Sequence, residues 1–231
     1  MSTLVLLPGL DGTGLLFADF IAALGPGIET IVVAYPCQEF RSYVQLEELA
    51  RAVLPAKRPF VLLGESFGGP LAISIAASRP PGLVGLILCC TFAKYPRAVL
   101  RKLRRAAPYV PVTGPIVSLV RDIFAPAKVS DAVRAKLTDA RDRVAKSVLR
   151  ARIGELLRVD LTNELAQIDV PILDLRARRD GVVPNRAGDD VRTRGRKVRA
   201  VDVDGPHFIL LAKPVETAAI VKDFLRSLPG T

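Results

Sequence analysis

The chain is poor in the features that mark several protein classes. Its three cysteines, Cys37, Cys89 and Cys90, are too few and odd in number for a disulfide framework, and no metal-ligand spacing accompanies them. No apolar run approaches the ~18–20 residues of a membrane span. The first residues carry neither a basic region nor a cleavage site and are expected to form a strand instead of a signal peptide. These absences predict a cytoplasmic protein without disulfides, metal or cofactor.

Short apolar runs alternate with helical patterns along most of the 231 residues, with no internal repeat or low-complexity tract. This alternation predicts an α/β fold, a doubly wound and mostly parallel six-stranded sheet. In such sheets ligands bind at the carboxyl ends of the strands. The expected strands are Thr3–Leu7, Glu29–Ala34, Phe60–Leu63, Leu83–Cys90, Val170–Ala177 and Lys197–Val203, and the expected helices are Leu15–Leu24, Ser42–Leu54, Leu71–Ala77 and Pro214–Leu228.

The alternation of predicted strands and helices stops between residues 92 and 168. We interpret this segment as a helical cap inserted into a core of residues 1–91 and 169–231. The insert holds 16 Lys and Arg against 7 Asp and Glu, a net of +9, while the remainder carries 17 against 16, a net of +1. One predicted helix places basic residues on one side, and the apolar stretch Tyr109 to Phe124 suits a lid over a pocket. The basic residues of that helix are Arg97, Arg101, Arg104 and Arg105.

The most informative stretch is Gly64-Glu65-Ser66-Phe67-Gly68, between an apolar run and a helix-competent segment. Gly-x-Ser-x-Gly in this context is typical of a nucleophile elbow, a tight strand-to-helix turn that exposes the serine. The glycines are required because neighbouring chain leaves no space for a β-carbon. An ordinary connecting turn has the same composition, so the remaining residues must decide between the two interpretations.

A serine hydroxyl needs a base to accept its proton, and the chain contains a single histidine, His207. His207 follows the last predicted strand, in Gly205-Pro206-His207-Phe208, which places it at the same sheet edge as Ser66. A lone histidine is often structural, but this position favours a role as the base.

A carboxylate should orient the imidazole. Asp180 follows the fifth strand at the edge where Ser66 is expected, and the order Ser66, Asp180, His207 is that expected with a nucleophile elbow. Asp204, close to His207 in sequence, is the main rival. The other candidates are less well placed, within strands or in a polar stretch: Asp174, Asp189, Asp190 and Asp202.

An oxyanion needs preorganised donors. We expect the backbone N–H of Phe67 to supply one and that of Leu10, in the glycine-rich loop after the first strand, to supply the other. That loop lacks the lysine of a phosphate loop and the spacing of a dinucleotide-binding loop, so nucleotide binding is poorly supported.

Four segments together resemble the α/β-hydrolase fold superfamily, over about residues 3–91 and 170–228. They are Leu-Leu-Pro-Gly-Leu-Asp-Gly-Thr-Gly, Gly-Glu-Ser-Phe-Gly-Gly, Val-Pro-Ile-Leu with Arg-Arg-Asp-Gly-Val-Val-Pro, and Gly-Pro-His-Phe. Two departures are visible: Pro8-Gly9 replaces the usual His-Gly, and the two leading strands of the family are missing. The resemblance implies a trimmed sheet, with the insert at the cap position.

The leading functional hypothesis is a serine hydrolase of carboxylic esters or thioesters with a hydrophobic acyl group. The alternatives are an acyltransferase or a lyase with the same triad, or a non-catalytic binding protein on this fold. The basic insert is either a solvated face or a surface for anionic substrates such as acyl-coenzyme A or acyl-carrier protein. An anionic membrane surface is a further possible partner. Nucleic acid is disfavoured because few aromatic residues lie among the basic ones.

Overall fold

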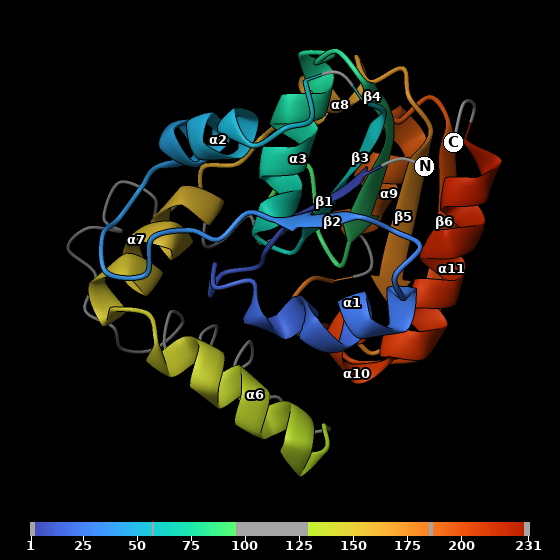
Figure 1. Cartoon of the computed structure of the whole chain (residues 1–231). Coiled ribbons are helices and arrows are strands. Elements are labelled where there is room, and N and C mark those ends of the chain that lie inside the picture. The colour runs from blue at the N-terminus through green and yellow to red at the C-terminus, as the bar shows by residue number, and fades with distance from the viewer. Residues whose placement is uncertain (1–2, 57, 96–128, 185–186, 229–231) are drawn as a thin grey trace.

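The computed structural model describes residues 3–56, 58–95, 129–184 and 187–228 (Figure 1). The predicted arginine-rich helix and the predicted lid at 109–124 lie outside these residues. The strands are β1 (Thr3–Leu7), β2 (Thr30–Val32), β3 (Phe60–Glu65), β4 (Leu83–Cys89), β5 (Ile172–Ala177) and β6 (Val198–Val203). They form one parallel sheet in the order β2-β1-β3-β4-β5-β6, which confirms the predicted fold class.

Helices cover both faces of the sheet (Figure 1). One face packs against α1 (Ala18–Leu24), α10 (Ile209–Ala212) and α11 (Pro214–Ser227). The other packs against α2 (Tyr43–Ala52), α3 (Gly68–Ala77), α8 (Thr162–Leu165) and α9 (Ala187–Arg194). Side chains of the central strands are apolar on both faces, as expected for parallel strands between two helical layers.

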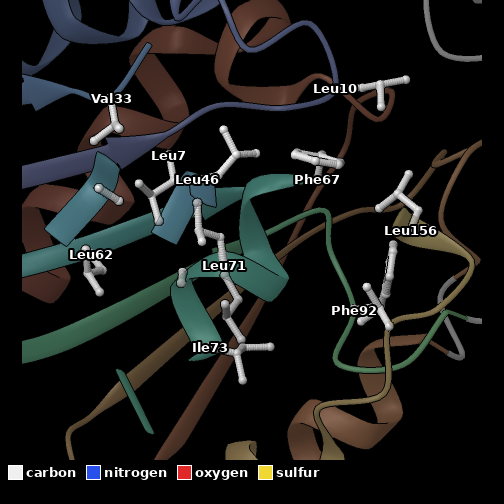
Figure 2. Close-up of a cluster of buried hydrophobic side chains, with 14 of the residues drawn as sticks. Leu7, Leu10, Val33, Leu46, Leu62, Phe67, Leu71, Ile73, Phe92 and Leu156 are labelled. Atoms are coloured by element: carbon white, nitrogen blue, oxygen red, sulfur yellow. The ribbon is translucent and has the colours of Figure 1, made fainter. Parts of the chain in front are cut away.

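The second of these apolar clusters continues into the segment that we interpreted as an insert. Helices α6 (Asp131–Asp142) and α7 (Lys146–Leu156) contribute Leu137, Val148 and Leu156 to the cluster that also contains Leu62 and Phe67. Figure 2 shows Leu10, Phe67, Phe92 and Leu156 among its members. The end of this segment is therefore packed against the loops at the carboxyl edge of the sheet.

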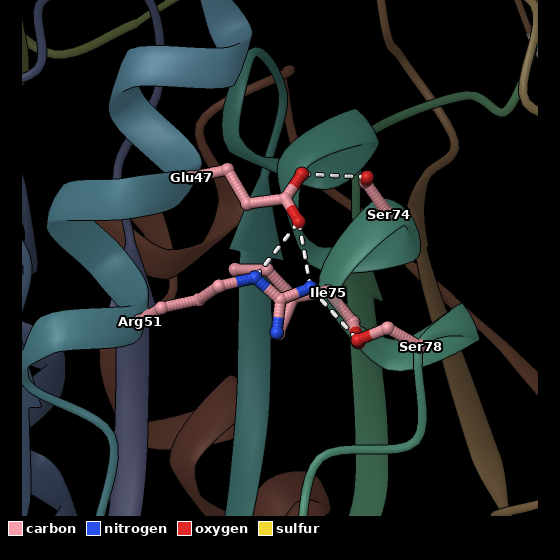
Figure 3. Close-up of polar contacts among 5 residues, drawn as sticks. All are labelled: Glu47, Arg51, Ser74, Ile75 and Ser78. Atoms are coloured by element: carbon pink, nitrogen blue, oxygen red, sulfur yellow. Dashed lines mark hydrogen bonds and ion pairs between the residues drawn. The ribbon is translucent and has the colours of Figure 1, made fainter.

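Helix α3 is tied to α2 by polar contacts on its outer side (Figure 3). Glu47 accepts a hydrogen bond from Ser74 Oγ at 2.6 Å and pairs with Arg51, which donates to Ser78 Oγ at 2.7 Å. These contacts limit sliding of α3, the helix that begins directly after the elbow.

Several element boundaries differ from the predicted ones. Strand β2 is limited to Thr30–Val32 because it is an edge strand that pairs only with β1. Strand β3 continues to Glu65 because Gly64 and Glu65 still pair with β4. The helix expected at 15–24 consists of a 3₁₀ turn, η1 (Leu15–Phe17), followed by α1, since Gly14 before it has a left-handed φ of 72°.

Candidate active site

Ser66 lies at the turn between β3 and α3, in a strained conformation. Its φ is +51°, a region that residues with a β-carbon rarely occupy. A β-carbon on Gly68 would lie 2.3 Å from the carbonyl oxygen of Leu7, and one on Gly64 would lie 2.6 Å from the carbonyl oxygen of Gly68. Both glycines are thus required by close backbone approach. The geometry is that expected of a nucleophile elbow.

Hydrogen bonds from β4 and the loop after it hold this turn. Ser66 N donates to the Cys89 carbonyl at 2.9 Å, and Thr91 Oγ1 donates to the Ser66 carbonyl at 2.6 Å. The Gly69 N–H also donates to that carbonyl, at 3.1 Å. Because these contacts saturate the Ser66 backbone, the strained φ is maintained and the side chain is directed away from the sheet.

The structure brings Ser66, His207 and Asp180 together from three different loops. His207 Nε2 lies 2.9 Å from Ser66 Oγ, and its Nδ1 lies 2.8 Å from Asp180 Oδ2. The other carboxylate oxygen, Oδ1, accepts the N–H groups of Val182 and Val183, both at 2.8 Å. With a carboxylate at Nδ1, that nitrogen carries the proton and Nε2 is left as a hydrogen-bond acceptor that faces the Ser66 hydroxyl.

Burial and charge act in opposite directions on His207, whose side chain is 3% exposed. Burial alone would lower its pKa, but the Asp180 carboxylate and its hydrogen bond outweigh burial, so the pKa of His207 is raised above its ordinary value. A raised pKa makes the imidazole a stronger proton acceptor.

Sequence reasoning gave no role to Glu65, the residue before Ser66. It is buried at the end of β3, and burial raises its pKa to about 8 despite the opposing effect of His207. The raised pKa favours the protonated, neutral form of the Glu65 side chain at pH 7. Only its tertiary surroundings make it unusual, since a Glu within Gly-x-Ser-x-Gly carries no local signal of burial.

The expected oxyanion donors are available and lie beside the elbow. Within the described residues, the backbone N–H groups of Leu10 and Phe67 donate to no other protein group. A β-carbon on Gly9 would lie 3.8 Å from the β-carbon of Ser66, which places the loop preceding Leu10 against the serine. Phe67 is the N-cap residue of α3, so its N–H is among the free amides of a helix start.

The rival carboxylates lie elsewhere. Asp204 is exposed and pairs with Arg179 at 3.0 Å, while Asp202 pairs with Arg176 at 2.8 Å. Asp174 is buried in β5, and burial raises its pKa to about 6. Asp189 and Asp190 lie in the first turn of α9. Of the candidates, only Asp180 is hydrogen-bonded to the imidazole.

One group in the described part of the chain has the donor atoms of a metal site. Ligand atoms of Cys90, Asp180 and His207 all lie within 4.8 Å of one another. These residues come from three loops, so no sequence spacing indicates the group. The imidazole Nδ1 and the carboxylate are already bonded to each other, and burial raises the pKa of the Cys90 thiol, so it is a poor thiolate donor.

Two further residues contact the backbone around the expected oxyanion donors. Arg152 of α7 is buried and donates to the carbonyl oxygens of Leu10 and Asp11. Tyr43 Oη donates to the carbonyl oxygen of Phe67 at 2.9 Å. Sequence reasoning missed both, because neither belongs to a motif and each lies far along the chain from its partners.

Fold and elbow together define the class of protein. A family model described as "Alpha/beta hydrolase family" matches residues 4–220, and the chain belongs to this family. It is an enzyme of the α/β-hydrolase class and is esterase-like in its relationships.

Individual relatives are distant. The chain is 27% identical over 244 residues to pimeloyl-[acyl-carrier protein] methyl ester esterase of Xanthomonas campestris, covering 98% of this chain and 96% of that protein. It is 30% identical over 115 residues to phytyl ester synthase 1, chloroplastic, of Arabidopsis thaliana, covering 47% of this chain and only 16% of that protein. Among solved structures, MenH from S. aureus superposes with a TM-score of 0.81 at 16% identity, covering 97% and 93% of the two chains.

In the part of the chain that the structure describes, no helix is both long and apolar enough to cross a bilayer.

Proposed function

We propose that this enzyme hydrolyses carboxylic esters or thioesters of a hydrophobic acyl group through an acyl-enzyme on Ser66. The observation that carries the proposal is the continuous chain of contacts from Ser66 Oγ through His207 to Asp180, at 2.9 and 2.8 Å. Nucleophile, base and orienting carboxylate are thereby in hydrogen-bond reach of one another, as serine catalysis requires.

The contacts suggest the order of events. Ser66 Oγ attacks the acyl carbon while its proton moves to His207 Nε2, and the carbonyl electrons move onto the oxygen, where the N–H groups of Leu10 and Phe67 stabilise it. The tetrahedral intermediate collapses, and the alcohol of an ester, or the thiol of a thioester, leaves with the proton from His207. Water then attacks the acyl-enzyme with His207 as the base, which releases the acid and restores Ser66. Asp180 stabilises the imidazolium at each stage without itself being protonated.

We propose further that the acyl group is presented on an anionic carrier, an acyl-carrier protein or coenzyme A. The relative that spans 98% of the chain carries a name that specifies an acyl-carrier protein ester. The charge distribution supports a similar preference here, because the net +9 of residues 92–168 would attract an anionic carrier. In this proposal residues 92–168 act as the cap of the active site.

Serine labelling tests the chemistry directly. The parent enzyme, Ser66→Ala and His207→Ala are each treated with a fluorophosphonate and examined by intact mass. We expect one adduct on the parent enzyme, none on Ser66→Ala and greatly slowed labelling of His207→Ala. An adduct that persists in Ser66→Ala would contradict the assignment, and an unlabelled parent enzyme would favour a non-catalytic binding protein.

The choice of substrate needs a separate comparison. Rates of hydrolysis are compared at low and raised salt for three kinds of substrate. These are methyl esters of acyl groups linked to an acyl-carrier protein, acyl-coenzyme A thioesters, and small neutral esters. Salt should weaken turnover of the carrier-linked substrates and leave the neutral esters unchanged, because screening acts on charge attraction. The double variant Lys146→Glu, Arg150→Glu, at two exposed positions of α7, should reproduce the effect of salt. If salt and the double variant changed the turnover of all three kinds of substrate equally, the carrier proposal would be contradicted.

Acyl transfer to an alcohol is the second candidate. It is favoured by the 30% identity, over about half of this chain, to a protein named an ester synthase. Incubation of the acyl-enzyme with a long-chain alcohol distinguishes the two: ester formation in excess of free acid would favour transfer, and free acid alone would favour hydrolysis.

A further inference from the structure

The strongest unexplained feature of the molecule is the buried arginine of α7. Arg152 is 1% exposed, and its guanidinium donates to three backbone carbonyls and to no carboxylate in the described part of the chain. The distances are 2.8 Å to Leu10, 2.7 Å to Asp11 and 2.9 Å to Pro36. Burying a charged side chain costs free energy, whereas an apolar side chain at position 152 would fill the same space at lower cost. Packing alone therefore does not explain an arginine at this position.

The carbonyl contacts fall on the loop that carries one expected oxyanion donor. The Leu10 carbonyl, which Arg152 binds, and the Leu10 N–H, the expected oxyanion donor, belong to one residue. Only the φ and ψ of Leu10 separate them, so fixing the carbonyl also restricts the N–H. The loop also fits closely around the guanidinium. Gly12 has a φ of +69°, and a β-carbon there would lie 2.6 Å from Arg152 Nη1 and 2.8 Å from the Tyr35 ring.

The same helix also reaches the second donor. Glu155, one turn beyond Arg152 on α7, accepts the backbone N–H of Tyr43 at 3.1 Å. The Tyr43 ring stacks on the Phe67 ring at 4.6 Å between centroids, and its hydroxyl donates to the Phe67 carbonyl. The peptide units flanking both expected donors are thus held from one helix.

We propose that α7 preorganises the oxyanion hole, with Arg152 as the positioning residue for Leu10 and Tyr43, held by Glu155, as the positioning residue for Phe67. This inference rests on the proposed function, because it assigns the purpose of these contacts to oxyanion stabilisation. It also gives the end of the cap segment a fixed role, since α7 must stay docked whatever substrate enters. Neither the Arg152 nor the Tyr43 side chain touches the reacting atoms.

The test compares Arg152→Lys with Arg226→Lys, an exposed position on α11. A lysine keeps the charge but cannot donate to three carbonyls in a fixed geometry. Each folded variant is measured for kcat and KM on a p-nitrophenyl ester and for affinity to two inhibitors. One is a trifluoromethyl ketone, which forms a tetrahedral oxyanion on Ser66, and the other is the corresponding alcohol, which cannot.

Removing one oxyanion donor typically costs about 10²–10³-fold in kcat, and misplacing one should cost less. We expect Arg152→Lys to lower kcat and ketone affinity together by about 10- to 100-fold, with KM and alcohol affinity within about twofold. Arg226→Lys should match the parent. A folded Arg152→Lys with parent kcat and ketone affinity would overturn the inference, as would a kcat loss that leaves ketone affinity unchanged.

Tyr43→Phe keeps the test decisive if Arg152→Lys does not fold, because it removes one hydroxyl and retains the ring stack. It should lower kcat and ketone affinity together by roughly 3- to 10-fold, less than loss of a whole donor. Unchanged values in this variant would also overturn the inference. Failure of the proposed function looks different, because the parent enzyme itself would then form no fluorophosphonate adduct at Ser66.

Discussion

Asp180→Asn is the substitution whose effect the geometry defines best. Asp180 Oδ1 accepts two backbone N–H groups, from Val182 and Val183, while Oδ2 faces His207 Nδ1. An asparagine at this position must direct its carbonyl oxygen at the two N–H groups, because its amide NH₂ cannot accept from them. The NH₂ then faces the imidazole, which reverses the polarity of that contact.

The consequence is the wrong histidine tautomer. With a donor at Nδ1, the ring carries its proton on Nε2, the nitrogen 2.9 Å from Ser66 Oγ. That nitrogen then cannot accept the serine proton. A tautomer reversal of this kind costs on the order of 10⁴-fold in kcat, or about 5 kcal/mol at 1.36 kcal/mol per tenfold change.

The assay is steady-state hydrolysis of a p-nitrophenyl ester together with the rate of fluorophosphonate labelling, which should fall in parallel. Asp204→Asn is the matched control, because Asp204 is the nearby acidic residue that pairs with Arg179 and not with the imidazole. We expect the control to retain full activity. If Asp180→Asn kept more than about a tenth of parental kcat, orientation of His207 by Asp180 would be refuted.

The pH dependence gives a second measure of the same contact. The base must be neutral, so activity rises with pH through the pKa of His207, and Asp180 holds that pKa above its ordinary value. Asp180→Asn removes the raising effect of the carboxylate, while the lowering effect of burial on the pKa of His207 remains. The acid limb of the residual activity should therefore move to lower pH, whereas an unchanged limb would mean that another group sets it.

Three further substitutions test the surroundings of Ser66. Gly68→Ala places a β-carbon 2.3 Å from the carbonyl oxygen of Leu7, so thermal melts should show a loss of at least about 3 kcal/mol or no folded protein; parental stability would contradict the close approach. Thr91→Val removes the buried 2.6 Å hydrogen bond to the Ser66 carbonyl, which keeps the Gly69 N–H as a donor, so urea unfolding should show a loss of about 0.5–1.5 kcal/mol; a cost near zero would mean that the Thr91 hydrogen bond makes no net contribution. Burial raises the pKa of Glu65 to about 8, whereas the unfolded chain releases this proton near pH 4.5, so the folded state binds more protons between these values and loses stability as pH rises through them. Glu65→Gln should not show this loss: between pH 4.5 and pH 8 its free energy of unfolding should rise by roughly 3–5 kcal/mol relative to that of the parent enzyme. A Tm difference between the two proteins that is independent of pH would exclude this linkage.

Much of the fold could be predicted from the sequence because the signals are local. Alternation of apolar runs with helical patterns identified all six strands, and their order along the chain indicated a parallel sheet. The strand boundaries were less accurate, because pairing with a neighbouring strand decides where a strand ends. Glu65 shows this, since its place in β3 depends on Cys89 of β4.

The elbow was visible for the same reason. The Gly-x-Ser-x-Gly pattern lies within five consecutive residues, and the close approach that requires Gly64 comes from the turn itself. The close approach that requires Gly68 comes from Leu7 of β1, so its cause is visible only in the folded structure. The position of the single histidine after the last strand also needed only the rule that carboxyl ends of parallel strands share an edge. The catalytic roles of these residues stay predictions for the labelling experiment to test.

Only the tertiary structure decided which residues far apart in the chain contact one another. Topology favoured Asp180 and proximity in sequence kept Asp204 as its main rival, and the fold places only Asp180 against the imidazole. Burial of Glu65 and the three carbonyl contacts of Arg152 have no local signature. Secondary structure follows from periodicities and turn chemistry within a few residues, but desolvation of a charge and its partners exist only once distant segments pack together.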